Sequence, residues 1–123
     1  MALICTEGLQ VINKDAVRQR FSKAIEYSKY EYEEFFLAQF FDLNFSYEDE
    51  SCTVVFPVED FMLNVRGKLH GGVIAFVTDV SMGHLCNKII GPCVTVEVKI
   101  QYLSAISSGK ISCKASFLKK GKS

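Results

Sequence analysis

The residues best suited to chemistry lie in the stretch LHGGVIAFVTD, residues 69–79, where Gly71 and Gly72 precede a long apolar run. Two glycines at the start of a helix leave backbone N–H groups unshielded by side chains and aligned with the positive end of the helix dipole. Such a terminus can stabilise the oxyanion that develops during acyl transfer. The alternative is structural, because the same glycines permit a tight turn or close packing against a strand.

Asp79 is a carboxylate inside this apolar run. Its neighbours Ala75, Val77 and Val80 place it where the pattern predicts burial, and an unpaired buried carboxylate is costly. A carboxylate kept in such a place suits the role of a general base. The alternative is that Asp79 lies at a subunit boundary, where it is solvated or hydrogen-bonded.

The spacing of these groups limits how they can cooperate. Gly72 and Asp79 are seven residues apart, which is about 10 Å along one helix at 1.5 Å per residue. One substrate carbon cannot easily touch both groups. If they serve one reaction, the carboxylate comes from a second copy of the chain, and the protein is a homodimer with two shared active sites.

Other kinds of site lack support in the sequence. Two histidines 14 residues apart, and cysteines without a paired short spacing, provide no recognisable set of metal ligands. Cys86 lies close to His84, but positions two apart on a helix do not face each other, which favours core packing over a catalytic dyad. The terminal GKS differs from a phosphate-binding loop because Ser116 stands where the first glycine is needed.

Composition limits the partners and the compartment. The 123-residue chain is 49% hydrophobic, which supports one domain with a sizeable core. Fourteen basic residues balance fourteen acidic ones, so neither nucleic acid nor a membrane is an expected partner. Five scattered cysteines without a signal peptide indicate free thiols and a cytoplasmic location. The longest apolar run is too short to span a bilayer.

The elements that must position the candidate residues follow from the apolar periodicity. From Asn13, a possible helix cap, apolar residues recur at helical spacing and predict an amphipathic helix whose end near Ser28 is undefined. These residues are Val17, Phe21, Ala24 and Ile25. From about Leu37, aromatic and β-branched residues on either side of the polar cluster EDES predict a β-hairpin.

Three further elements complete the expected fold. Residues 69–89 are apolar on nearly every side, which predicts a long helix wrapped by other structure and stopped by Gly91 and Pro92. Residues 94–106, VTVEVKIQYLSAI, begin with a strict alternation that predicts a long half-buried strand. A turn at 107–110 leads to another alternating strand, ISCKASFLKK, and the chain ends where the sheet is expected to continue.

The sequence resembles the hotdog-fold acyl-CoA thioesterases, specifically the PaaI-like branch, in three features taken together. These are Asn64, the HGG segment with Asp79 nine residues after His70, and the strand pair that ends at Lys122. The resemblance covers residues 37–122. It implies an α+β fold in which a long central helix is wrapped by a curved antiparallel sheet. The chain would be one domain, 1–123, with an N-terminal helical extension over 1–36 and a hotdog core over 37–123 whose last strand or strands are missing.

The resemblance also implies roles for individual residues. The Gly71 amide, with help from Asn64, would polarise the thioester carbonyl, and Asp79 of the partner subunit would act as general base or nucleophile. Thr95 would help hold the attacking water, while His70 would shape the loop. The residues expected to bind substrate are Gly72, His70 and Asn64. The substrate would be an acyl-CoA, no cofactor or metal would be needed, and the assembly would be a homodimer or homotetramer.

Other functions on the same fold remain open. A non-catalytic hotdog module, which binds acyl-CoA or serves as an assembly subunit, is favoured by the short C-terminus but disfavoured by the joint presence of Asn64, Gly71, Gly72 and Asp79. A hydratase would require a histidine and acid pair near a substrate β-carbon, and the sequence shows no such pair. A pure scaffold would neither bind CoA nor hydrolyse an acyl-CoA.

Overall fold

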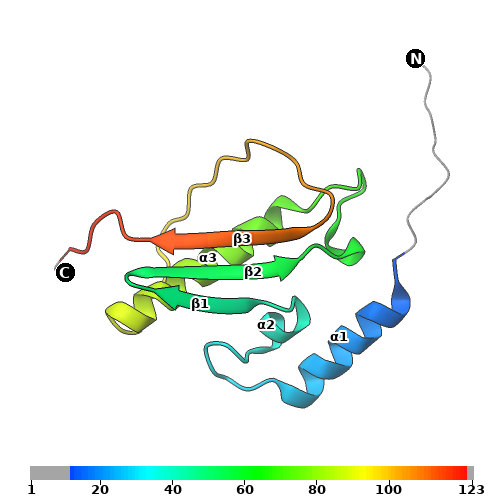
Figure 1. Ribbon diagram of the computed structural model, residues 1–123, viewed down its shortest axis with the longest axis horizontal. Helices are drawn as coiled ribbons and strands as arrows, with labels where there is room; N and C mark the ends of the chain where they lie inside the picture. Colours follow the sequence, from blue (N-terminus) through cyan, green and yellow to red (C-terminus); the bar gives the residue numbers. More distant parts are fainter. Residues whose placement is uncertain (1–11, 122–123) are drawn as a thin grey trace.

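In the computed structural model, which describes residues 12–121, a three-stranded sheet packs against one long helix (Figure 1). The elements, in chain order, are α1 (Lys14–Tyr27), α2 (Phe36–Phe40), β1 (Asn44–Glu48), β2 (Ser51–Pro57), the 3-10 helix η1 (Asp60–Met62), α3 (Gly71–Ile89) and β3 (Lys110–Ser116). The strands are antiparallel in the order β1-β2-β3. The first eleven residues of the expected N-terminal extension, including Cys5, and the last two residues of GKS lie outside the described residues.

α1 begins where the sequence predicts. The Asn13 side chain caps it by accepting a hydrogen bond from the Ala16 N–H at 3.1 Å, which satisfies one of the orphan donors of the first turn. The helix ends at Tyr27, with Ser28 as its C-cap.

The predicted apolar face of α1 is only partly buried. Ala24 is fully buried, whereas Phe21 and Ile25 remain 51% and 62% exposed. The reason is that α1 packs mainly against the short α2 rather than against the sheet (Figure 1). Arg20 supports this packing, because its guanidinium donates to the Phe40 carbonyl of α2 at 3.0 Å, and it also pairs with Glu59, just before η1, at 2.8 Å.

The predicted β-hairpin is confirmed, but it begins later than expected. The aromatic residues from 36 to 40 form α2, and β1 starts only at Asn44. β1 and β2 pair around a turn in which Asp49 has a φ of 51°. Residues in β2 alternate between buried and half-buried, as a strand covered on one face requires. The fully buried residues of this strand are Cys52, Val54 and Phe56.

The predicted central helix is confirmed as α3, which lies across one face of the sheet (Figure 1). Its Val77, Val80 and Leu85 pack in the core with the buried face of β2. The helix stops before Gly91, which has a φ of 132° that favours glycine. No helix among residues 12–121 has the length and apolar character needed to cross a bilayer.

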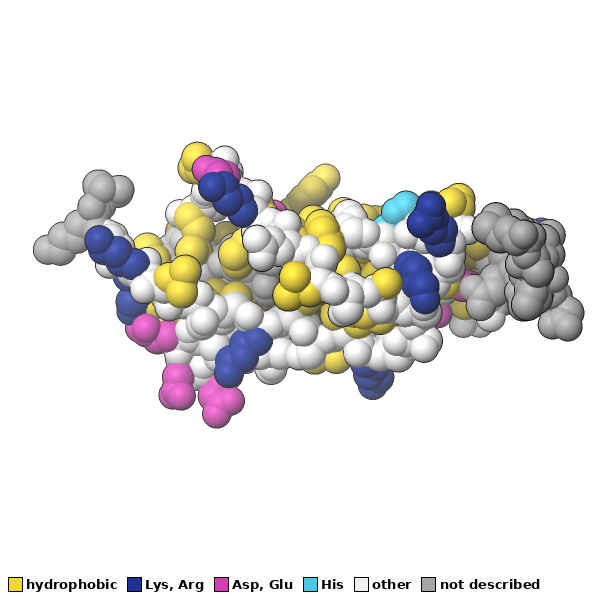
Figure 2. Space-filling model, turned by 90° about the horizontal axis from the view of Figure 1, so that it is seen from above, with side chains coloured by type: hydrophobic (Ala, Val, Ile, Leu, Met, Phe, Trp, Pro, Cys, Tyr) yellow, Lys and Arg dark blue, Asp and Glu magenta, His cyan; other side chains and the backbone are white. Residues whose placement is uncertain are grey.

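The strand predicted over residues 94–106 is wrong in this structure. Residues 91–109 form neither helix nor strand, and they pass beyond β3, the outer strand of the sheet on this side (Figure 1). A strand is defined by backbone hydrogen bonds to a neighbouring strand, and this segment forms no such ladder with β3 or with any other described strand. Val94 and Val96 consequently remain 88% and 95% exposed. Figure 2, seen from above this side, shows apolar side chains across the middle of the face and charged ones mostly toward its ends.

Candidate active site

The N-terminus of α3 presents two backbone donors. The Val73 and Ile74 N–H groups donate to the His70 carbonyl at 3.0 and 3.4 Å. Within residues 12–121, the N–H groups of Gly71 and Gly72 have no hydrogen-bond partner, and the side chain of His70 does not cap the helix. The positive end of the helix dipole therefore offers two free amides, which is the arrangement that an oxyanion needs.

Tyr102, which was not among the predicted site residues, holds this terminus. Its hydroxyl donates to the Gly71 carbonyl at 2.8 Å. A Cβ at position 71 would lie only 3.1–3.3 Å from two ring carbons and the hydroxyl oxygen of Tyr102, so the contact favours glycine there. In the sequence, apolar residues stand at every second position from Val94 to Ile100, and Tyr102 continues this alternation. The alternation could have placed Tyr102 on the same face as those residues.

Asn64 is engaged by its own loop. Its Oδ1 accepts hydrogen bonds from the backbone N–H groups of Arg66 and Lys68 at 2.9 and 3.1 Å. These bonds close a tight turn in which Gly67 has a φ of 72°. The side-chain oxygen is therefore committed to the loop, and the side-chain NH₂ is the group left to meet a ligand.

His70 is exposed, and its backbone N–H donates to the Met62 carbonyl at 3.0 Å. This bond ties the start of α3 to η1. The contact is consistent with the loop-shaping role expected for His70, and the described residues provide no partner that would orient its ring as a base.

Asp79 and Thr95 are brought together by the fold. Asp79 is half-buried on α3, and the Thr95 hydroxyl donates to its Oδ1 at 2.5 Å. Among residues 12–121, no basic side chain forms an ion pair with Asp79. A carboxylate fixed through one oxygen, with the other oxygen unpaired by the described chain, can accept a proton from a bound water.

The two halves of the predicted site are not brought together within one chain. Gly71 and Asp79 are eight positions apart on α3, which corresponds to about 12 Å of helix at 1.5 Å per residue. The arrangement therefore agrees with the spacing argument that one substrate carbon cannot meet both groups in a single subunit.

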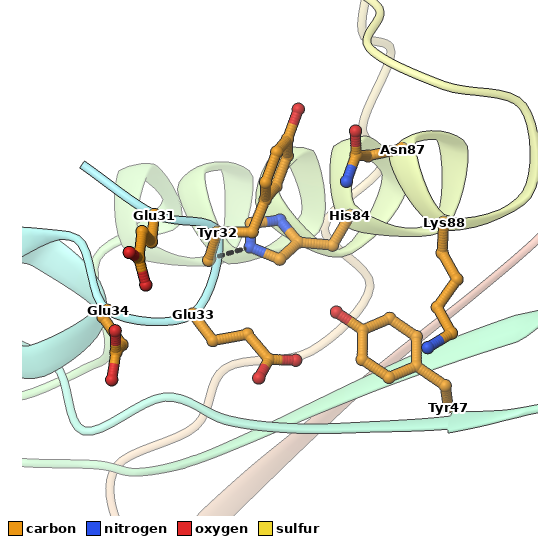
Figure 3. Close-up of a pocket in the computed structure, with 8 residues that line it drawn as sticks. All are labelled: Glu31, Tyr32, Glu33, Glu34, Tyr47, His84, Asn87 and Lys88. Carbon is orange, nitrogen blue, oxygen red and sulfur yellow. Dashed lines mark hydrogen bonds between the residues drawn. The ribbon is translucent and has the colours of Figure 1, made fainter. Parts of the chain in front are cut away.

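A cavity of about 690 Å³ lies elsewhere, near the C-terminal end of α3 (Figure 3). Its lining residues are Glu31, Tyr32, Glu33, Glu34, Tyr47, His84, Asn87 and Lys88. None of the predicted site residues is among them.

His84 forms the buried wall of this cavity. Its Nε2 contacts the Tyr32 carbonyl (Figure 3). Its Nδ1 lies 2.9 Å from the Val80 carbonyl, and Phe45 stacks on its ring with centroids 4.5 Å apart. Burial and a hydrogen bond with Glu33 raise the pKa of Tyr47 well above its ordinary value. These contacts fasten the 31–35 segment to α3 and β1, and they indicate a structural role.

Comparisons with known proteins identify the family. The model of the thioesterase superfamily matches residues 66–123. The conserved protein PA5202 from Pseudomonas aeruginosa is 30% identical, over 70% of this chain and 72% of that chain, with a TM-score of 0.65. The chain belongs to the thioesterase superfamily. No curated protein matches this thioesterase-superfamily chain.

Two further structures establish the fold of this superfamily member. The BH2602 protein from Bacillus halodurans, solved with CoA, has a TM-score of 0.72 at 21% identity, over 89% of this chain and 74% of that chain. The E. coli PaaI protein from the phenylacetic acid degradation operon has a TM-score of 0.69 at 20% identity, over 87% and 76%. The predicted α+β hotdog fold, and the resemblance from which it was inferred, are confirmed.

Proposed function

We propose that this chain is an acyl-CoA thioesterase, which hydrolyses an acyl-CoA to the free acid and CoA. The observation that carries the proposal is the half-buried Asp79, which is held by the Thr95 hydroxyl at 2.5 Å and is free of any ion pair within the described residues. The structural similarity to BH2602, which was solved with CoA, supports CoA as the thiol part of the substrate.

The proposed reaction needs only groups of the protein and one water. The Gly71 and Gly72 N–H groups, with the Asn64 side-chain NH₂, donate to the thioester carbonyl oxygen and stabilise the negative charge that develops there. Asp79 of the partner subunit takes a proton from water as the water oxygen attacks the carbonyl carbon. Collapse of the tetrahedral intermediate breaks the C–S bond, and the departing CoA sulfur takes up the proton. Direct attack by the same carboxylate is the nucleophilic variant of this route.

The dimer is part of the proposal, because the two halves of the site lie about 12 Å apart on one helix. A twofold arrangement brings Gly71 of one subunit near Asp79 of the other and generates two identical sites. The exposed apolar residues Val94, Val96 and Leu103 provide surface that a second copy can cover. A dimer of such dimers is compatible with the same site. The four described cysteines are free, which supports the proposed cytoplasmic location.

The test is hydrolysis of a panel of aryl and aliphatic acyl-CoAs, followed by release of the CoA thiol. Asp79→Asn and Asp79→Ala are compared with wild type, and Asp49→Asn serves as a control because it changes an exposed carboxylate at a turn where asparagine tolerates the positive φ. We expect wild type and Asp49→Asn to turn over at least one substrate, and both Asp79 variants to lose most of that rate while remaining folded dimers. An inert wild type, or Asp79 variants as active as wild type, would favour a non-catalytic acyl-CoA-binding module or an assembly subunit.

A further inference from the structure

The chain reverses direction directly after α3. The N–H groups of Ile90 and Gly91 both donate to the Cys86 carbonyl, at 2.8 and 3.0 Å, and close the last turn of the helix. Gly91 then adopts a φ of 132° and Pro92 follows. This sharp stop turns the chain back toward the helix that it has just left.

The returning segment lies against α3. Thr95 reaches Asp79, about two turns before Cys86, and Tyr102 reaches Gly71 at the far end of the helix. Cys93 follows this reversal two residues after Gly91 and two before Thr95, so it lies close to Cys86, and, after burial, its thiol contributes to the raised pKa of Cys86. The pair thus joins the end of α3 to the segment that positions Thr95.

The two thiols differ in accessibility. Cys93 is exposed and Cys86 is half-buried, and burial, followed by the neighbouring Cys93 thiol, raises the pKa of Cys86. Thiolates are the reactive species in exchange with disulfides, and access governs which sulfur reacts first. Cys93 is therefore suited to react first, and Cys86 is placed to attack it afterwards.

The other two described cysteines provide an internal contrast. Cys52 faces Ala115 across the β2–β3 pair, and Cys113 faces Val54, so Cys52 and Cys113 are diagonal neighbours. Diagonal positions are about 7–8 Å apart, which is beyond the usual Cα separation of a disulfide, up to about 6.8 Å. Burial raises the pKa of both thiols.

We propose that Cys86 and Cys93 form a reversible disulfide that ties the C-terminal end of α3 to the segment carrying Thr95. The oxidant is a low-molecular-weight disulfide such as oxidised glutathione. The Cys93 thiolate attacks one of its sulfurs, the S–S bond breaks, and one thiolate leaves. The Cys86 thiolate, after losing its proton to water, then attacks the Cys93 sulfur and expels the second. The two protein thiols are oxidised to one disulfide, and the small disulfide is reduced to two thiols.

The disulfide also controls the candidate active site, and this part of the inference depends on the proposed function. Bond formation brings the two sulfurs to about 2.05 Å, which draws Cys93 toward the helix and displaces Thr95 from Asp79. A displacement of about 1 Å at a positioning group can lower a rate by up to about 100-fold. We expect the oxidised protein to hydrolyse acyl-CoA roughly tenfold more slowly than the reduced protein.

The disulfide is tested by peptide mapping, which does not require activity. The reduced full chain is incubated with oxidised glutathione, quenched with an alkylating reagent and digested with trypsin without reduction. Cleavage after Lys68, Lys88 and Lys99 places Cys86 in peptide 69–88 and Cys93 in peptide 89–99. We expect these two peptides to be linked, to separate again after dithiothreitol, and to remain linked in the control Cys113→Ser.

The variants separate the possible outcomes. Cys86→Ser and Cys93→Ser should lose the link and leave a glutathione mixed disulfide on the remaining thiol, most readily on Cys93. The proposal is overturned if wild type stops at the mixed disulfide, if Cys93 links two chains instead, or if the Cys52–Cys113 link forms as readily. Should the link form while the oxidised protein matches the reduced one in rate, the control of the site is refuted. An inactive reduced protein would reject the proposed function and leave the peptide map to decide the disulfide.

Discussion

A site shared between two subunits makes a quantitative prediction for mixed dimers. The first subunit carries Gly71→Pro, which removes one N–H group at the first position of α3, where proline is well tolerated. The preceding His70 has φ −56° and ψ 132°, a conformation compatible with a following proline. Loss of one oxyanion donor is expected to lower kcat by about 100- to 1,000-fold. Gly71→Ala is the matched control, because it makes the same Cβ contact with Tyr102 but keeps the N–H group.

The second subunit carries Asp79→Asn, which keeps the shape of the side chain and removes its charge. In a heterodimer of the two variants, one site receives both substitutions, and the other receives intact Gly71 and Asp79. Random pairing makes about half of the dimers heterodimers, and each heterodimer has one intact site out of two. The activity of the mixture should therefore return to about one quarter of the wild-type activity. If Gly71 and Asp79 instead act within one chain, every subunit of the mixture lacks one of them, and its activity should stay close to zero. Within one chain the two residues lie about 12 Å apart along α3.

The assay mixes the two inactive variants in equal amounts, exchanges their subunits by mild denaturation and refolding, and follows thiol release from the best substrate of the panel. Size-exclusion chromatography and circular dichroism verify that every sample contains folded dimers. Activity that stays at the average of the two parent variants after exchange would refute the shared site. Equal losses in Gly71→Pro and Gly71→Ala would show that the contact with Tyr102, and not the amide, limits the rate.

Three further predictions concern single contacts. Thr95→Val removes a hydrogen bond to a carboxylate and should lower kcat about tenfold, whereas Thr95→Ser should retain most of the rate in the same assay. His84→Phe keeps an aromatic ring but loses both contacts with backbone carbonyls, so the free energy of unfolding measured in urea should fall by about 1–3 kcal/mol; an unchanged value would contradict the structural role. The folded state raises the pKa of Tyr47, so stability should be insensitive to this group below the ordinary tyrosine pKa of about 10 and decline as the pH rises above it. Urea titrations of wild type and Tyr47→Phe at several alkaline pH values check this, because the variant should show a smaller decline.

Local sequence patterns determined much of the architecture. The cap at Asn13, the central helix with its stop at Gly91, and the β3 strand all depend on residues within a few positions of one another. The first two formed as predicted, whereas β3 ends at Ser116 and leaves the last residues of the predicted strand, 117–120, outside it. The hotdog resemblance likewise depended on short motifs, and the comparisons confirmed it. Such features are readable from sequence because capping, helical periodicity and turn conformations are local in origin.

Contacts between distant residues were decided only by the tertiary structure. The alternation over residues 94–106 was present in the sequence, but a strand forms only by backbone pairing with another strand, and among the described residues this segment pairs with none. The same segment nevertheless brings Thr95 to Asp79 and Tyr102 to Gly71, because the reversal after α3 lays it along the helix. The sequence alone therefore identified the residue types and spacing of the candidate site. The path of the chain determined which of them meet, since such contacts depend on how distant elements pack and not on the neighbours of each residue.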